Sequence, residues 1–231
     1  MSGEPAILDL ISAWPSLEAS VLPNAPFDLH LMAGECALVE AYDPERITAF
    51  ADLCSGMVHL RQGSIQFSGY DWAELDPERA AALRGRIGRI YRKGAWISTL
   101  GTHVSIVLGM LHHTREPEQL ISQAAMALAR RLGLPGLPLE RPDQLSDGDL
   151  ARAACVRAFL GTPQLLLLER SIGDDHPELT VPILDLLSQA LDRGAAAICF
   201  THDAAFWLAQ SFPISRRFRL LENGLQPVEI D

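Results

Sequence analysis

The feature that most limits the fold of this chain is the regular alternation of short apolar runs with longer helical patterns. Parallel strands need helical crossovers, so this alternation predicts an α/β fold with a mostly parallel sheet. The predicted strands are Phe27–Leu31, Cys36–Glu40, Ser64–Phe67, Ile87–Tyr91, Leu165–Glu169, Ala196–Phe200, Phe218–Glu222 and Gln226–Ile230. The predicted helices are Pro44–Cys54, Pro77–Leu83, Thr102–Leu111, Glu116–Leu132, Asp147–Leu160, Glu178–Arg193 and Ala204–Ser211.

Two features add detail to this sheet. Asn223-Gly224 is a hairpin signal because both residues tolerate positive φ, and it predicts an antiparallel β edge. Between Tyr91 and Leu165 the pattern is wholly helical, which predicts a helical subdomain inserted into the sheet. We therefore expect a single domain, 1–231, in which an α/β core (1–91 and 161–231) carries a helical subdomain at about 92–160.

Composition and charge narrow the class of protein. Hydrophobic residues are 48% and charged residues 21% of the 231 residues, as in an ordinary globular protein. No apolar run reaches the ~18 residues of a membrane span and the first residues lack a basic signal-peptide start, so we expect a cytoplasmic chain without direct membrane insertion. The net charge of −10 opposes binding to nucleic acid. The four cysteines are widely scattered, which predicts buried or free thiols.

Several short segments carry motifs in one order along the chain. They are Gly34–Val39, Gly63–Gly69, Ile87–Arg92, Leu145–Asp149, Leu165–Glu169 and Cys199–Asp203. In this order and spacing the sequence resembles the nucleotide-binding domain of ATP-binding cassette (ABC) transporters over nearly its whole length. The resemblance implies a P-loop NTPase-like (RecA-like) core. Gly94–Leu100 is also similar, more loosely, to the GALFxSL segment of ATPases that serve maintenance-of-lipid-asymmetry transporters.

The segment in the place of the phosphate-binding loop departs from the family pattern. Such a loop needs glycines, a lysine on the phosphates and a Ser or Thr on Mg²⁺. Aligned without a gap, this chain has glutamates, Glu40 and Glu45, at the two motif glycines, Arg46 at the lysine and Ile47 at the hydroxyl, followed by Thr48. A unit charge pair 4 Å apart costs about 4 kcal/mol at an effective dielectric of 20, against about 8 kcal/mol for a micromolar ligand. Two inward-pointing glutamates would therefore cancel most of the affinity for a triphosphate.

The residues that act on Mg²⁺ and water in the family are also changed. Glu169 takes the place of the Walker B aspartate, Arg170 that of the catalytic glutamate, and Arg92 that of the Q-loop glutamine. Gly173–His176 departs from the D-loop pattern, whereas Leu145, Ser146, Gly148 and His202 match the signature and the switch histidine. The resemblance thus implies a degenerate nucleotide site made of Arg46, Thr48 and Arg92. His202 and Glu169 would be catalytic only if activity is retained, and no protein metal centre is expected.

This asymmetry suggests a role. In the family two domains pack head to tail, and each ATP lies between one P-loop and the other domain's signature helix. A chain with a damaged P-loop could therefore complete its partner's site through Ser146 and Gly148. We expect a pseudo-ATPase that binds an integral-membrane permease at the inner face of the membrane and forms a homo- or heterodimer with another nucleotide-binding domain. ATP and Mg²⁺ are cofactors of its own site only if that site still binds them.

Two other functions stay open from the sequence. One is a weakly active ATPase that uses Arg46, Thr48, Glu169 and His202; the other is a soluble adaptor with this fold and no permease. Structural roles are alternatives for single residues. Ser146 could cap a helix, and His202 could cap a strand end. Glu169 could pair with Arg170, and Arg46 with Glu40 or Glu45. The sequence gives no role to Tyr42 or Trp96, and cargo and transport direction stay open.

Overall fold

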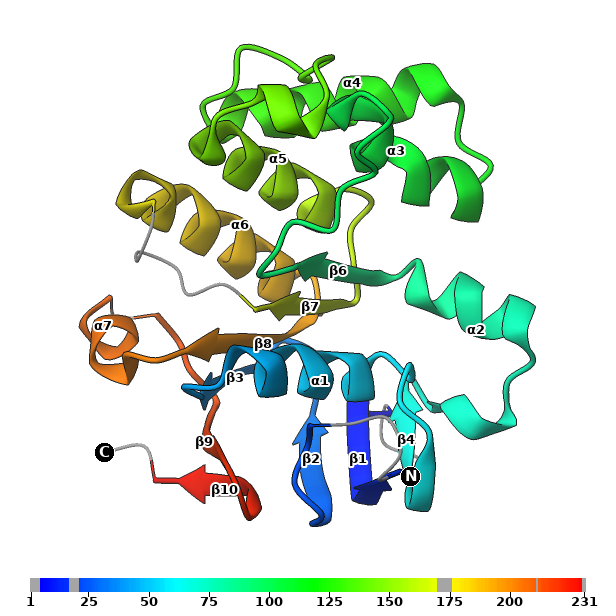
Figure 1. Ribbon diagram of the computed structural model, residues 1–231, viewed down its shortest axis with the longest axis vertical. Coiled ribbons are helices and arrows are strands. Elements are labelled where there is room, and N and C mark those ends of the chain that lie inside the picture. Colours follow the sequence, from blue (N-terminus) through cyan, green and yellow to red (C-terminus); the bar gives the residue numbers. More distant parts are fainter. Residues whose placement is uncertain (1–4, 17–20, 170–175, 211, 230–231) are drawn as a thin grey trace.

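The computed structural model describes residues 5–16, 21–169, 176–210 and 212–229 (Figure 1). Its larger sheet has six strands in the order β10-β9-β3-β8-β7-β6. The strands are β3 (Cys36–Glu40), β6 (Ile87–Ile90), β7 (Leu165–Leu168), β8 (Ala196–Thr201), β9 (Arg216–Leu221) and β10 (Gly224–Val228). All neighbouring pairs are parallel except β9 and β10. The mostly parallel sheet with an antiparallel edge is therefore confirmed.

A second, antiparallel sheet has the order β2-β1-β4-β5. Its strands are β1 (Leu8–Pro15), β2 (Phe27–Leu31), β4 (Leu60–Phe67) and β5 (Tyr70–Asp71). The sequence patterns did not predict β1 because its register shifts between Leu10 and Ala13, where Ser12 has a φ of +43°. The shift leaves the apolar side chain of Ile11 47% exposed and breaks the alternation that marks a strand.

The helices match the predicted order. They are α1 (Pro44–Cys54), α2 (Pro77–Arg84), α3 (Thr102–His113), α4 (Glu118–Arg131), α5 (Asp147–Phe159), α6 (Thr180–Asp192) and α7 (Ala204–Ala209), with 3₁₀ turns at Trp72–Glu74, Pro142–Gln144 and Pro177–Leu179. Helix α4 begins after Pro117, and α6 follows the turn Pro177–Leu179, so both start two residues later than predicted. The β9–β10 hairpin also forms, with Gly224 paired to Leu221 at a φ of +111°.

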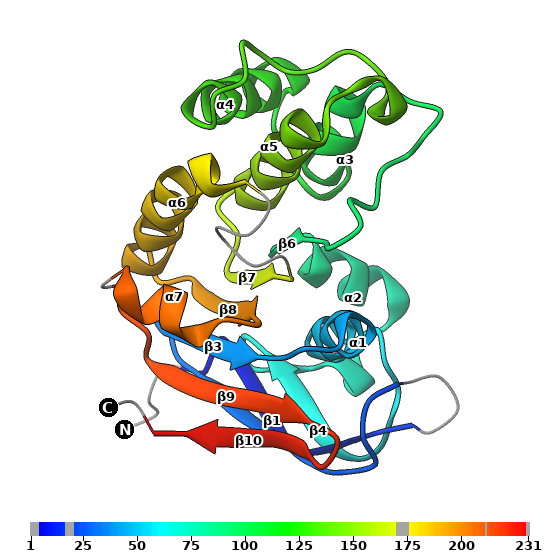
Figure 2. The same cartoon turned by 60° about the vertical axis from the view of Figure 1, so that its left-hand side comes forward.

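The larger sheet is buried on both faces. Along β3, Cys36 and Leu38 join one apolar core, and Ala37 and Val39 join the other, because successive side chains point to opposite faces. The first core includes residues of α3, α4, α5 and α6; the second joins α1 to both sheets. Figures 1 and 2 show α1 between the two sheets and the α3–α5 group at the far end of the molecule.

Helices α3, α4 and α5 all lie between β6 and β7 in sequence, so the described part of this stretch has no strand. Because Ile106 of α3 and Ala125 of α4 share one core with Leu166 of β7, the packing does not separate the inserted helices from the sheet. The subdomain boundary at 92–160 stays a prediction. No helix of the described residues is long and apolar enough to cross a membrane.

Gly88 tests how closely the inserted helices pack on β6. A Cβ added at Gly88 would lie 2.0 Å from the main-chain oxygen of Ala158, at the end of α5. Because that atom is backbone, we expect Gly88→Ala to lower the free energy of unfolding by at least about 1–3 kcal/mol, measured by urea denaturation. Gly109→Ala in α3 is the matched control, since its added Cβ meets no atom within 4 Å. Equal stability of the two variants would contradict this packing.

Candidate functional site

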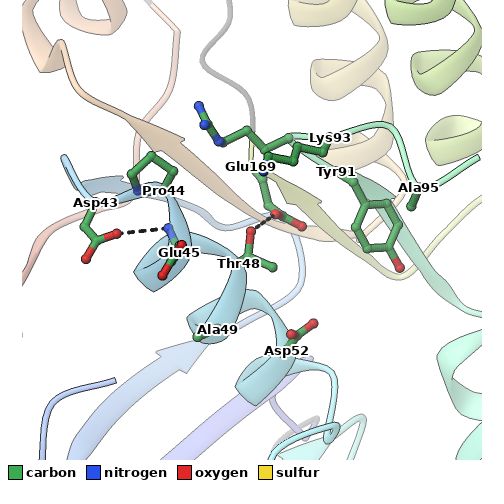
Figure 3. Close-up of a pocket in the computed structure, with 11 residues that line it drawn as sticks. Asp43, Pro44, Glu45, Thr48, Ala49, Asp52, Tyr91, Lys93, Ala95 and Glu169 are labelled. Carbon is green, nitrogen blue, oxygen red and sulfur yellow. Dashed lines mark hydrogen bonds between the residues drawn. The ribbon is translucent and has the colours of Figure 1, made fainter. Parts of the chain in front are cut away.

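The candidate site lies at the carboxyl edge of the parallel strands. This edge is where open α/β sheets bind ligands. The strand β3 leads there into α1, β6 into Tyr91 and Arg92, and β7 into Glu169. A cavity of about 580 Å³ opens between them (Figure 3). It is lined by Asp43, Pro44, Glu45, Thr48, Ala49, Asp52, Tyr91, Arg92, Lys93, Ala95 and Glu169.

The structure gathers part of the predicted set of residues at this cavity. Thr48, Arg92 and Glu169 line it, whereas half-buried Arg46 is not among the lining residues. His202 follows β8 at the same edge of the sheet and is exposed, and Ser146 and Gly148 lie at the start of α5. The lining also includes Lys93, the only lysine of the chain.

The first turn of α1 is capped by the chain's own carboxylate. Asp43 Oδ1 accepts a hydrogen bond from the main-chain N–H of Glu45 at 3.0 Å, drawn in Figure 3, and one from the main-chain N–H of Arg46 at 3.4 Å. Pro44, the first residue of the helix, has no N–H to donate. A helix N-terminus is an anion site because of these N–H groups and the helix dipole. In this chain the Asp43 carboxylate accepts hydrogen bonds from two of these N–H groups.

The two glutamates of this loop point in different directions. Glu40 pairs with Arg219 of β9 at 3.3 Å and accepts a hydrogen bond from the Tyr42 hydroxyl at 2.8 Å. This hydrogen bond, with the negative charge of Glu40, raises the pKa of Tyr42. Glu40 does not line the cavity, but Glu45 does. Only one of the two glutamates, Glu45, therefore lines the cavity, and the condition of two inward-pointing glutamates is not met.

A buried cluster of charges lies behind the cavity. The Arg89 guanidinium of β6 contacts Glu169 Oε1 at 2.5 Å, Asp52 Oδ1 at 2.6 Å and the main-chain oxygen of Thr48 at 3.2 Å. The side chains of Arg89 and Glu169 are 5% and 1% exposed. Thr48 Oγ1 donates a hydrogen bond to Glu169 Oε2 at 2.7 Å, drawn in Figure 3. Both carboxylate oxygens of Glu169 therefore have partners within the protein.

Arg89 stays charged in this cluster. Burial alone would lower the pKa of its guanidinium, but the charge of Glu169 and the hydrogen bond to Asp52 outweigh burial, and the pKa is raised above its ordinary value. The stability that this cation contributes is present below its ordinary pKa and is lost only above the raised one. Ordinary changes of pH near neutrality therefore leave the arginine protonated.

The predicted ion pairs need correction. Arg46 pairs with Asp43, at 3.7 Å, and has no ion pair with Glu40 or Glu45 within the described residues. Arg170 and Gly173–Asp175 lie outside the residues that the structure describes. Sequence reasoning missed Arg89 as a site residue, although one signal was available. An arginine inside a strand expected to be buried needs a carboxylate partner.

The segment that resembles the signature has a clear structural role. The Ser146 hydroxyl accepts a hydrogen bond from the Asp149 N–H at 3.1 Å and donates one to Asp149 Oδ2 at 2.8 Å. The predicted N-cap is thus confirmed, with acidic residues in the first turn of α5.

Trp96 is half-buried against the core, and the Arg157 guanidinium lies 4.3 Å from its ring centroid. Within the described chain no group of three His, Cys, Asp or Glu side chains could hold a metal ion.

In this fold, α1 starts after the inner strand β3 at the carboxyl edge of the sheet, as in a P-loop NTPase-like protein, and solved ATP-binding cassettes share the fold. The dimeric post-hydrolysis structure of the ATP-binding cassette MJ0796 bound to ADP and Pi matches 97% of this chain and 99% of its own, with a TM-score of 0.81 and 17% identity. A structure of the ATP-binding subunit of an ABC transporter matches with a TM-score of 0.78 and 19% identity, over 97% of this chain and 90% of its own. These likenesses show the fold.

The chain belongs to the family of ABC transporter ATP-binding subunits. It is 30% identical over 201 residues to the nickel import ATP-binding protein NikE of Pseudomonas putida, covering 85% of this chain and 72% of NikE. It is also 30% identical over 159 residues to the intermembrane phospholipid transport system ATP-binding protein MlaF of Haemophilus influenzae. That match covers 68% of this chain and only 60% of MlaF. No protein-family model matches the sequence. The predicted family and fold are confirmed.

We expect the Arg89–Glu169 pair to matter far more for stability than an exposed pair. Arg89→Met leaves the Glu169 carboxylate buried without its counter-charge, and should lower the free energy of unfolding by about 3–5 kcal/mol. Arg216→Met removes the more exposed pair with Glu35, at 3.4 Å, and should cost about 0–1 kcal/mol. Urea denaturation measures both. A double variant, Arg89→Met with Glu169→Met, should recover much of the loss, and the absence of recovery would contradict a buried pair.

Proposed function

We propose that this chain is a degenerate nucleotide-binding subunit of an ABC transporter, impaired or inactive in its own ATP site. The observation that carries the proposal is the Asp43 carboxylate on the N–H groups of Glu45 and Arg46. A phosphate at the start of α1 would need these same donors and would meet the negative charge of Asp43. The Asp43 carboxylate therefore occupies the N–H groups that a phosphate would bind in the family.

The residues around the cavity also fit a triphosphate poorly. Asp43, Glu45 and Asp52 line its α1 side, and the loop lacks the glycines that would let main-chain N–H groups approach phosphates. Arg92 and Lys93 supply two cations on the opposite side, but Glu169 has both oxygens engaged. Arg170, in the place of the catalytic glutamate, cannot accept a proton from water. Hydrolysis in this site would lack its usual base.

A weakly active ATPase is the second candidate. Thr48 and Glu169 meet at 2.7 Å beside the cavity, His202 follows β8, and the relatives are named ATP-binding proteins. In this alternative Arg46, Thr48 and Arg92 would bind ATP, and Glu169 and His202 would act in catalysis. The capped helix start argues against it because ATP would have to displace Asp43 from the two N–H groups.

Thermal denaturation of the purified chain with ATP and Mg²⁺ distinguishes the two candidates. If free ATP is present at about 100 times its Kd, binding stabilises the folded chain by about 2.7 kcal/mol. For a chain of this size that raises the Tm by about 5–10 °C. We expect no shift at millimolar nucleotide, because Asp43 and Glu45 oppose the phosphates. An active family member is the positive control. A rise of this size in the wild-type chain would support the weakly active ATPase and contradict our proposal.

We further propose that the chain binds a membrane permease at the cytoplasmic face and pairs with a second nucleotide-binding domain. The similar MJ0796 structure is described as a dimer, and the relatives NikE and MlaF are ATP-binding proteins of import and transport systems. Ser146 is exposed at the start of α5, where it could reach a nucleotide held by a partner. Asp147 and Asp149 add negative charge there and weaken this contact.

Phospholipid is the cargo that the Gly94–Leu100 resemblance favours, although relatives with other named cargoes are equally similar.

We expect a tagged chain to co-purify with an integral membrane protein from detergent-solubilised membranes. In that complex, Ser146→Asp should reduce ATP hydrolysis at least tenfold, because it places a carboxylate against the partner's γ-phosphate. Asp can cap a helix as Ser does, but it cannot donate the hydrogen bond to Asp149, so the Tm of this variant is measured beside its activity. Ser146→Asn is the neutral control that keeps the cap. A chain recovered without any membrane protein would support the adaptor alternative, and full activity of Ser146→Asp would contradict a role in the partner's site.

A further inference from the structure

We infer that Arg89 takes the place of the Mg²⁺ ion in this site, so that the site needs no divalent cation. The inference rests on the proposed function and adds the identity of the resident cation. In the family the Walker B carboxylate and the P-loop hydroxyl face Mg²⁺. Here Glu169, in the Walker B place, accepts a hydrogen bond from the Arg89 guanidinium, as do Asp52 and the main-chain oxygen of Thr48 in α1. Ile47 stands in the place of the P-loop hydroxyl, and the neighbouring Thr48 hydroxyl donates to Glu169.

The oxygens around Arg89 form the kind of set that a hard cation prefers. Two are carboxylate oxygens, from Glu169 and Asp52, and one is the main-chain oxygen of Thr48. They lie 2.5 to 3.2 Å from three different guanidinium nitrogens. Mg²⁺ uses the same donor types at shorter distances and keeps several waters. An arginine satisfies these oxygens without water.

Glu169 lines the cavity, but both of its oxygens have partners within the protein, so Mg²⁺ could bind it only by displacing one of them. The side chains of Arg89 and Glu169 are 5% and 1% exposed, and the Tyr91 ring covers the guanidinium with its centroid 4.4 Å away. Arginine does not give up its proton at neutral pH, so the cation is permanent. A metal ion that bound Glu169 directly would have to displace a hydrogen-bonded group from one of its oxygens.

The charge of the cluster agrees with this exchange. One guanidinium faces two carboxylates, so the cluster keeps a net charge of about −1, where a divalent ion would have neutralised it. Asp52 is 33% exposed and lines the cavity, which places the remaining negative charge toward solvent. A triphosphate that entered the cavity with Mg²⁺ would be repelled by the net negative charge of this cluster, and it would find no unpaired Glu169 oxygen to bind the metal.

Manganese binding, measured by electron paramagnetic resonance on the full chain, tests the inference. We expect the wild-type chain to leave the spectrum of millimolar Mn²⁺ unchanged, and its Tm to be the same with Mg²⁺ as with NaCl of equal ionic strength. Arg89→Met should lose several degrees of Tm, regain part of them with Mn²⁺, and bind Mn²⁺. Arg89→Met with Glu169→Gln should show no such rescue.

Wild-type binding of Mn²⁺ that disappears in Glu169→Gln would overturn the inference, whether or not Arg89→Met folds. A folded Arg89→Met that ignores Mn²⁺ would also overturn it. Nucleotide measurements separate this inference from the proposed function. ATP that binds equally well with Mg²⁺ or with EDTA would contradict the proposed function and support the internal cation. A chain that ignores ATP but binds Mn²⁺ through Glu169 would contradict the internal cation alone.

Discussion

The buried ion pair between Arg89 and Glu169 is the contact on which the site depends. It joins the ends of the adjacent strands β6 and β7, and through Thr48 and Asp52 it also fixes α1 against them. Removing Arg89 would leave the buried Glu169 carboxylate without its counter-charge, whereas Arg89 without Glu169 would keep only Asp52 as an ion-pair partner. The position of the first helix after the central strand is therefore tied to a cation that the chain itself supplies.

The same principle operates at the other end of the site. Asp43 lies on the N–H groups that begin α1, and Arg46 lies beside it at 3.7 Å. An internal anion thus takes the helix start and an internal cation takes the Walker B carboxylate. The Arg89–Glu169 pair satisfies buried polar groups without a ligand, and Asp43 satisfies two N–H groups at a more exposed helix start. Under the proposed function, these two features would stabilise the fold without the glycines and lysine of a phosphate-binding loop.

The sequence was sufficient for the order of elements because long periodic patterns are strong signals. Helix α1 and strand β3 were predicted at their observed bounds, whereas β1 was missed because its bulge at Ser12 hides the alternation. The charge cluster could not be predicted in detail. Arg89 finds its partners 37 to 80 residues away, and only the packing of three elements decides which carboxylate it meets. Glu40 likewise pairs with Arg219 of the neighbouring strand β9, which lies 179 residues later in the sequence.

Internal ions change what holds the site together. In a protein that binds its ligand only when folded, the ligand adds to stability in proportion to its concentration. Here Arg89 and Asp43 are covalently part of the chain, so their contribution does not depend on nucleotide or metal. Under the proposed function, a subunit of this kind would present the same surface at any concentration of nucleotide. A stability that does not depend on ligand suits the proposed structural role. On this proposal, a chain keeps the fold of a family without keeping the chemistry of its site.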